Sequence, residues 1–460
     1  MNKIFLKILF FAVLMTGANY LNADECRVDE AVELLKEFQV QQLNYCYQEY
    51  FRINGLYKSS PYVKEVDIAT TGFAISGLIV AAEKGLISLI EAKDMALKTI
   101  NSCINLQKDP SQNYCGFLYH FYVFNEYTDS LEHKSGVEVS TIDSSLLLAG
   151  IITAGEYFNT KGYPEVKEKA REFYANINWS MFFDYNSELF RMSWQGKFNG
   201  HWDFYTDEIV LIVLLAQGSP NPEYRVDIRQ SFGNIRIKKG VYKGSEYAYS
   251  WYGSLFTYLF AHTFMDFRRL GKDILYDMDW WQNTKNAVSA DISWCKTSSY
   301  PKDIFGLSAA WSKKTPYSDE MEYRDRVGAA LCGAGEGARV YNDKNGIRPV
   351  APYASIGSLP FFDDQPLLEN PSFKMFAKIR TKAVDRSGLL VESLDASKLD
   401  SNGIPEVNSH WLVGMDIVFP ALMIENYFSG LIWDNFMNNF QVQFALLKTF
   451  PGYYMYLVRK

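Results

Sequence analysis

The amino-acid sequence predicts an all-α fold, a toroid of helical hairpins with minor β insertions. Apolar residues recur at helical spacing along most of the 460 residues, in about a dozen separate segments. The pattern does not contain the strand rhythm of a parallel sheet. Long helices joined by long loops suit a toroid, whereas an α-solenoid is disfavoured because no sequence unit repeats with a fixed period.

The helices are placed in chain order by apolar periodicity and by capping residues. The clearest apolar face is formed by Ile142, Leu146, Ala149 and Thr153. Ser140 and Asp143 have the spacing of a capping box before that face, and Thr206 is a predicted N-cap. The predicted helices cover residues 27–50, 66–84, 89–106, 140–159, 164–178, 206–217, 248–270, 283–291, 327–341, 369–384, 417–428 and 433–448. Strand-like alternation is limited to residues 232–242 and 389–394.

The first residues have the pattern of an export signal. Lys3 and Lys7 flank the start of a short apolar run, and Ala23 precedes acidic residues at the expected cleavage point. A membrane anchor is the alternative, but the run is too short to span a bilayer comfortably. We therefore expect a signal peptide at 1–23, a helical extension at 24–65 and the main domain at 66–460. The mature protein would be periplasmic or secreted, with no stable membrane span.

Charge and composition exclude several functions. There are 46 Lys and Arg residues against 53 Asp and Glu, a net charge of -7, with no basic block, so nucleic acid is not the expected partner. The five histidines are not at ligand spacing, so a metal site built from histidines is not expected. We expect no cofactor. Aromatic residues make up 16% of the chain, which indicates aromatic-lined surfaces or clefts of the kind that bind sugars.

Six cysteines allow either disulfides or buried thiols. Export would permit pairing, and a bond between Cys103 and Cys115 would close a short loop between two helices. Buried free thiols are the alternative.

Several carboxylates are predicted at helix starts. Glu208 follows Thr206 in a first turn, beside aromatic residues that could raise its pKa and make it a general acid. The alternative is that it only complements the helix dipole. Asp143 is explained by capping, whereas Glu138 lies outside that helix. Asp416 is a lone carboxylate in an apolar neighbourhood, with Pro420 predicted in the first turn that follows. Such a set suits glycoside hydrolysis.

An ordered set of short strings resembles the bacterial glucoamylase-like family. That family includes endo-β-1,2-glucanases and the middle domain of cyclic β-1,2-glucan synthases. The strings cover roughly residues 66 to 448 and include Thr70-Thr-Gly-Phe-Ala-Ile-Ser-Gly-Leu78, Gly116-Phe-Leu-Tyr-His-Phe121, Glu138-Val-Ser-Thr-Ile-Asp143, Trp202…Tyr205…Glu208, Asp266-Phe-Arg268, and Trp411…Asp416…Met423-Ile-Glu-Asn-Tyr427. Asp416 is followed by Ile417-Val418-Phe419, where the family usually has Gln-Gly-Pro.

The resemblance implies an (α/α)6 barrel that hydrolyses a β-linked glucan, β-1,2-linked by preference, without a metal in the chemistry. It implies Glu208 as general acid, Asp416 as base and Glu138 as a further acidic residue of an inverting site. The positions implied as sugar contacts are Trp202, Tyr205, Asp266, Arg268, Trp411 and Tyr427, with Asp143 also at the substrate. We expect the four aromatic residues among them to line one concave face.

Two other functions stay open. A catalytically weak or inactive relative would bind envelope glucan without cleaving it. A polysaccharide lyase on the same toroid would need a Tyr/His or Tyr/Arg pair, and Tyr119-His120 is the only adjacent Tyr/His pair.

Overall fold

The computed structural model describes residues 27–48, 52–125, 127–128, 130–250, 253–315, 319–324 and 346–459. It is mostly helical, as the periodicity predicted, with short strands between the helices. The expected signal peptide, the predicted helix at 327–341 and the cysteines at 26 and 332 lie outside the described residues.

The helices are α2 (Val28–Tyr47), α3 (Ile68–Glu83), α4 (Leu89–Lys108), α5 (Thr141–Thr160), α6 (Pro164–Ala175), α7 (Trp179–Phe182), α8 (Asp207–Gly218), α9 (Ile228–Gly233), α10 (Phe256–Leu259), α11 (Trp280–Thr297), α12 (Pro352–Gly357), α13 (Pro371–Ile379), α14 (Gly414–Phe428), α15 (Leu431–Met437), α16 (Phe440–Thr449) and α17 (Pro451–Arg459).

The strands are β1 (Arg52–Ile53), β2 (Leu56–Tyr57), β3 (Glu65–Asp67), β4 (Asn113–Tyr114), β5 (Phe117–Leu118), β6 (Phe121–Asn125), β7 (Ser130–His133), β8 (Val139–Ser140), β9 (Phe183–Asp184), β10 (Leu189–Trp194), β11 (Phe198–His201), β12 (Lys239–Tyr242), β13 (Ser245–Ala248), β14 (Ala310–Lys313), β15 (Met321–Arg324), β16 (Pro349–Val350), β17 (Ser393–Leu399) and β18 (Pro405–Ser409). Each described strand pairing is antiparallel.

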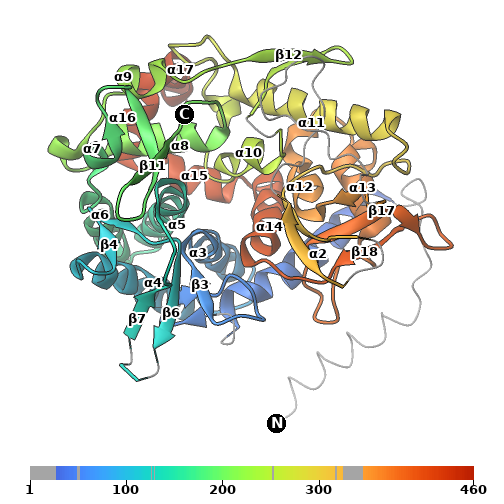
Figure 1. Ribbon diagram of the computed structural model, residues 1–460, viewed down its shortest axis with the longest axis horizontal. Coiled ribbons are helices and arrows are strands. Elements are labelled where there is room, and N and C mark those ends of the chain that lie inside the picture. Colours follow the sequence, from blue (N-terminus) through green and yellow to red (C-terminus); the bar gives the residue numbers. More distant parts are fainter. Residues whose placement is uncertain are drawn as a thin grey trace.

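An inner group of helices surrounds the middle of the molecule (Figure 1): α3, α5, α8, α10, α12 and α14. Contacts run from α3 to α5, α5 to α8, α8 to α10, α10 to α12, α12 to α14, and α14 back to α3. Other helices pack outside them: α2 on α3 and α14, α4 on α3, α6 on α5, α11 on α10, and α13 on α12. The chain therefore alternates largely between outer and inner helices.

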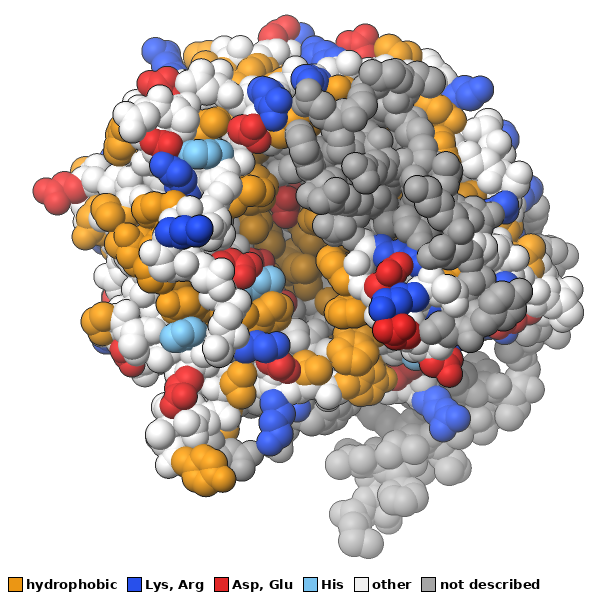
Figure 2. All heavy atoms as spheres, in the orientation of Figure 1, with side chains coloured by type: hydrophobic (Ala, Val, Ile, Leu, Met, Phe, Trp, Pro, Cys, Tyr) orange, Lys and Arg blue, Asp and Glu red, His pale blue; other side chains and the backbone are white. Residues whose placement is uncertain are grey.

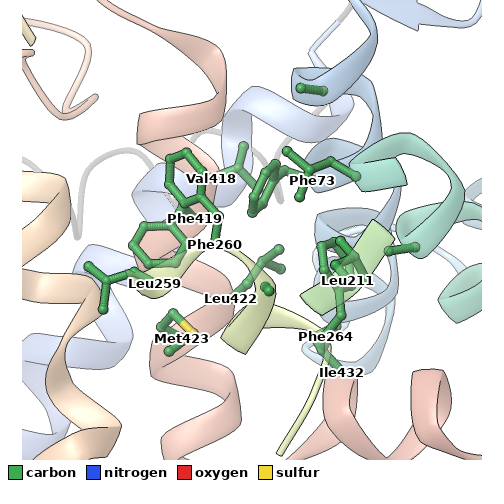
Figure 3. Close-up of a cluster of buried hydrophobic side chains, with 14 of the residues drawn as sticks. Phe73, Leu211, Leu259, Phe260, Phe264, Val418, Phe419, Leu422, Met423 and Ile432 are labelled. Carbon is green, nitrogen blue, oxygen red and sulfur yellow. The ribbon is translucent and has the colours of Figure 1, made fainter. Parts of the chain in front are cut away.

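Apolar side chains fill the space between the inner helices (Figure 3). Phe73 of α3, Phe260 and Phe419 of α14 contact one another, with ring centroids 5.1 to 6.2 Å apart. All three are buried. The residues from Ile417 to Phe419, where the chain departs from the family's usual string, are thus part of this core.

Two glycines bring α3 and α5 into backbone contact. A Cβ on Gly72 would overlap the backbone of Leu146, and one on Gly150 would overlap the backbone of Gly72. Because the two helices touch here, their first turns start side by side, which positions Asp67 and Asp143 near each other.

The predicted helix at 248–270 is wrong. That stretch contains the end of β13, the short α10 and two 3-10 turns, Ala261–Thr263 and Phe267–Arg269. Gly253 has a φ of 71°, outside the helical region, so a continuous helix cannot form. The strand predicted at 232–242 is limited to β12, and the one at 389–394 begins only at Ser393.

Within the described residues, no single helix has the length and hydropathy of a membrane span. The pair α14 and α15 meets those limits only when taken together, with a bend of 89° between them.

Candidate active site

Acidic residues lie at the N-terminal ends of four inner helices. Asp67 caps α3, Asp143 is in the first turn of α5, Glu208 follows Asp207 in the first turn of α8, and Asp416 is in the first turn of α14. Helix dipoles favour negative charge at these ends. The acidic groups sit close enough to act on one another, since charge on Asp143 acts on Glu208 and charge on Asp67 acts on Asp416.

A cavity of about 390 Å³ opens beside Glu208. It is lined by Met192, His201, Trp202, Asp203, Phe204, Thr206, Glu208, Arg236, Phe256 and Thr257. The molecule is hollowed near the middle of the face seen in Figure 2, with hydrophobic and acidic side chains in the wall. The cavity thus combines a carboxyl group with apolar and aromatic walls, as ligand sites commonly do.

Glu208 is a buried carboxyl group in the first turn of α8, and its pKa is raised. Thr206 caps α8 as predicted, since its hydroxyl accepts a hydrogen bond from Ile209 N at 3.4 Å. Burial and the charge of Asp143 raise the pKa of Glu208 to about 8, against the lowering effect of Thr206. Burial therefore outweighs the hydrogen bond with Thr206, and a pKa of about 8 favours the protonated form of Glu208 at neutral pH.

Three carboxylates surround His120, which follows β5. Its Nε2 lies 3.8 Å from Asp67 Oδ1, and its Nδ1 lies 3.6 Å from Glu138 Oε1 and 3.7 Å from Asp143 Oδ2. Burial lowers the pKa of His120, but the three carboxylates raise it to about 9. A hydrogen bond from His120 lowers the pKa of Glu138. His120 is therefore a cation that holds three acidic groups together, a role that the sequence did not reveal.

A second acidic residue, Glu392, accompanies Asp416. Both side chains are buried, and Asp416 Oδ1 and Glu392 Oε2 lack a hydrogen-bond partner among the described residues. Trp311 N donates to Glu392 Oε1 at 3.2 Å. Burial and the neighbouring carboxyl raise the pKa of Asp416, and burial raises that of Glu392 to about 8. Two adjacent carboxyl groups cannot both ionise cheaply, so the pair retains a proton at neutral pH.

Sequence reasoning missed Glu392. The available signal was a single acidic residue in an otherwise apolar strand-like run. Asp416 lies inside α14 rather than before it, because the helix begins at Gly414 and Pro420 falls in its second turn.

Trp202 is at the cavity, whereas Tyr205 is not. Trp202 Nε1 donates to Thr141 Oγ1 at 2.9 Å. Tyr205 is fully buried, stacks on Trp280 with centroids 4.7 Å apart, and accepts a hydrogen bond from Asn283. Tyr205 is thus a core residue in this structure, not part of a concave sugar-binding face.

Asp266, Arg268 and Tyr427 lie toward the other end of α14. Tyr427 is 11 residues beyond Asp416 in α14, roughly 16 Å along the helix. Arg268 Nε pairs with Asp266 Oδ1 at 2.7 Å, and its guanidinium also pairs with Asp363, whose charge acts on Tyr427. The structure therefore does not bring these three predicted contacts together with Glu208.

No group of three His, Cys, Asp or Glu side chains in the described part of the chain is arranged to hold a metal ion. Cys103 and Cys115 are both free thiols, so the disulfide considered from the sequence is not formed. Cys103 is buried in α4, while Cys115 lies in a turn with a φ of 54°.

The chain is similar in sequence and in fold to known proteins. A family model described as "Putative glucoamylase" matches residues 199–440. A solved structure with the same description, from Bacteroides uniformis, is similar with a TM-score of 0.72 and 17% identity, covering 93% of this chain and 99% of that one.

Two similar solved structures are described by their activity. An endo-β-1,2-glucanase from Chitinophaga pinensis, in complex with sophorotriose and glucose, has a TM-score of 0.68 and 17% identity over 92% of this chain and 98% of that one. An endo-β-1,2-glucanase mutant from Talaromyces funiculosus, in complex with β-1,2-glucan, has a TM-score of 0.63 and 12% identity over 93% of each chain. Among curated proteins, none matches the sequence. At these identities the solved structures show a common fold.

Proposed function

The chain belongs to the glucoamylase-like family, and from that premise we propose that it is a glycoside hydrolase that cleaves a β-linked glucan. The sequence of contacts through α3, α5, α8, α10, α12 and α14 supports an (α/α)6 barrel as its scaffold. The cleft would lie where the first turns of the inner helices meet.

The observation that carries the proposal is the buried Glu208 carboxyl group in the cavity wall. A carboxyl group with a pKa of about 8 holds its proton at neutral pH and can deliver it to a leaving group. Trp202 lines the same cavity, and we propose that its aromatic ring contacts a sugar ring there.

In the proposed reaction, Glu208 gives its proton to the glycosidic oxygen as the bond to the anomeric carbon breaks. Asp416 takes a proton from water, directly or through a substrate hydroxyl, and the water oxygen bonds to the anomeric carbon from the opposite face. Configuration at that carbon is inverted, so a β-linked glucan yields the α-anomer first. The two carboxyl groups end with exchanged protonation and return to their starting state through solvent.

We propose that the three carboxylates around His120 affect the reaction through their positions and charges. They are Glu138, Asp143 and Asp67. Held by His120, they fix the electrostatic potential beside Glu208 without needing to touch the breaking bond. We propose that Glu138 orients the site in this way.

β-1,2-glucan is the proposed substrate because two solved structures with this fold are endo-β-1,2-glucanases. The test is incubation of the purified protein with β-1,2-, β-1,3-, β-1,4- and β-1,6-glucans, followed by chromatography and NMR of the products. Cleavage of the β-1,2-glucan with the α-anomer appearing first supports the proposal. No product from any of the glucans would overturn hydrolysis.

One observation favours the second candidate, a glucan-binding protein with little activity. Asp416 is buried beside Glu392, and a protonated Asp416 cannot accept a proton from water. Retention of the protein on immobilised glucan, without release of product, would support this alternative.

Export remains part of the proposal, since polymeric envelope glucans lie outside the cytoplasm. N-terminal sequencing of the protein from its native host checks it, and a mature chain that begins just after Ala23 is the expected result.

Asp143→Asn is expected to move the alkaline limb of the kcat/KM profile to lower pH. The negative charge of Asp143 raises the pKa of Glu208, and a neutral side chain removes that effect. Since activity needs protonated Glu208, the limb near pH 8 should shift down by roughly half to one unit. Activity measured from pH 5 to 9 checks this, with the exposed Asp94→Asn as control. An unchanged limb would mean that another group sets it.

A further inference from the structure

Four aromatic side chains form a continuous row beside the first turn of α14. The row consists of Tyr62, Trp411, Trp311 and Tyr323, with successive ring centroids 5.7, 6.0 and 5.7 Å apart. Adjacent ring planes are tilted by 46° to 58°. The rings come from three separate segments of the chain: Tyr62 precedes β3, Trp311 and Tyr323 pair across the β14–β15 hairpin, and Trp411 follows β18.

The backbone ties this aromatic row to the proposed base. Trp311 N donates to Glu392 Oε1 at 3.2 Å, and Glu392 N donates to Trp411 O at 3.0 Å. Gly414 N, at the start of α14, donates to Ser59 O at 2.8 Å, which fixes the segment that carries Tyr62. The two tryptophans in the middle of the row therefore lie next to the Asp416–Glu392 pair, with Tyr62 and Tyr323 at the two ends of the row.

The row is accessible, unlike most aromatic clusters of this protein. Tyr62 and Tyr323 at its two ends are 56% and 54% exposed, and both tryptophans are only partly buried. The rings around Phe419, by contrast, are buried in the core. Exposed aromatic rings that adjoin one another mark binding surfaces more often than core packing.

The charges around the row favour a carbohydrate over a membrane or a protein core. Ion pairs between Lys313 and Asp319 and between Lys314 and Glu320 lie on the β14–β15 hairpin that carries Trp311 and Tyr323. Tilted rings interspersed with charged side chains offer separate apolar faces with polar neighbours. Sugar rings have that alternation, since C–H groups cover the ring faces and hydroxyls surround the edges.

We propose that the aromatic row is a binding platform for a glucan chain, holding glucose units on the Asp416 side of the bond that is cleaved. This inference rests on the proposed function and extends it from Trp411 to Tyr62, Trp311 and Tyr323. The platform makes the protein prefer polymers over short oligosaccharides, because only a long chain reaches from the catalytic groups to the outer rings.

The test compares Tyr62→Ala/Tyr323→Ala with the wild type and with Tyr454→Ala, a control that is 61% exposed on α17. Affinity electrophoresis in gels that contain linear β-1,2-glucan measures polymer binding. Hydrolysis of a β-1,2-linked trisaccharide measures the catalytic centre, and thermal unfolding checks that each variant is folded.

The expected result is polymer affinity reduced by about 2- to 10-fold for each ring removed, as for other aromatic contacts, with a smaller change in trisaccharide cleavage and no change in the Tyr454→Ala control. Polymer affinity of the double variant equal to that of the wild type would overturn the platform while leaving the proposed hydrolase intact. A wild type that neither binds the polymer nor cleaves the trisaccharide would overturn both the platform and the proposed function.

Discussion

Glu208→Gln is expected to lower kcat on β-1,2-glucan by about 10²- to 10⁴-fold and to leave substrate affinity within a few-fold of the wild type. Gln has nearly the same shape as protonated Glu but has no acidic proton to give. The loss should therefore fall on the chemical step and not on binding. Single-turnover kinetics and titration with glucan measure the two effects separately.

The same variant has a second readout that does not depend on activity. The pKa of Glu208 is raised on folding from about 4.5 to about 8, so the folded protein binds more protons than the unfolded chain between these values. Glu208 therefore contributes stability below pH 4.5 that is lost as pH rises through 8. Glu208→Gln, which does not ionise, should be more stable than the wild type at pH 8, by roughly 1 to 3 kcal/mol.

Glu223→Gln, an exposed position just beyond α8, is the matched control and should change neither property. Wild-type turnover by Glu208→Gln would remove Glu208 as the acid. A variant that is inactive and also less stable at pH 8 would indicate a damaged fold rather than a lost proton donor.

Local signals in the sequence predicted the helix starts well. The hydroxyls of Thr206 and Ser140 cap α8 and α5 as expected, because capping depends on residues only three positions apart. Those caps also place Glu208 and Asp143 in their first turns. The position of the proposed acid in its helix therefore follows from local sequence alone.

Contacts between distant segments do not follow from local sequence. Glu392 lies next to Asp416 because a β hairpin returns the chain to the start of α14, and His120 meets Glu138 through packing against α5. No spacing in the sequence predicts either contact. The burial of Tyr205 could not be predicted from the sequence either. The aromatic segment that contains it has the same sequence pattern whether its rings face a cleft or the core.

The length of α14 argues against one of the sequence-based expectations, that Tyr427 lines one concave face with Trp202, Tyr205 and Trp411. Asp416 and Tyr427 both lie in α14. The predicted helix already separates the two residues by most of its length. A rise of 1.5 Å per residue puts the two ends of α14 too far apart for a single sugar unit. The prediction of a long helix at 248–270 was wrong for another reason. Gly253 has a left-handed backbone conformation that interrupts a helix, and the spacing of the apolar residues does not reveal it.

Asp416→Asn is expected to remove most turnover at every pH, also by about 10²- to 10⁴-fold, if Asp416 is the base. Glu392→Gln should behave differently. Charge on Glu392 raises the pKa of Asp416, so a neutral partner lets Asp416 ionise at lower pH. Because a base must be deprotonated to act, the acidic limb of the kcat profile should move to lower pH in Glu392→Gln, while activity near neutrality persists.

The pair of variants separates the two candidate functions. In a hydrolase that uses Asp416, the Asn variant is inactive and the Gln variant is active with a shifted limb, since only one of the two carboxyl groups faces the water. If the roles are exchanged, Glu392→Gln is the inactive variant and Asp416→Asn carries the shifted limb. In a glucan-binding protein both variants keep the wild-type affinity, and any residual turnover of the wild type is unaffected by either change. Each variant leaves only one ionisable carboxyl group of the Asp416–Glu392 pair. Comparing the two variants therefore tests whether the carboxyl groups at the start of α14 take part in catalysis.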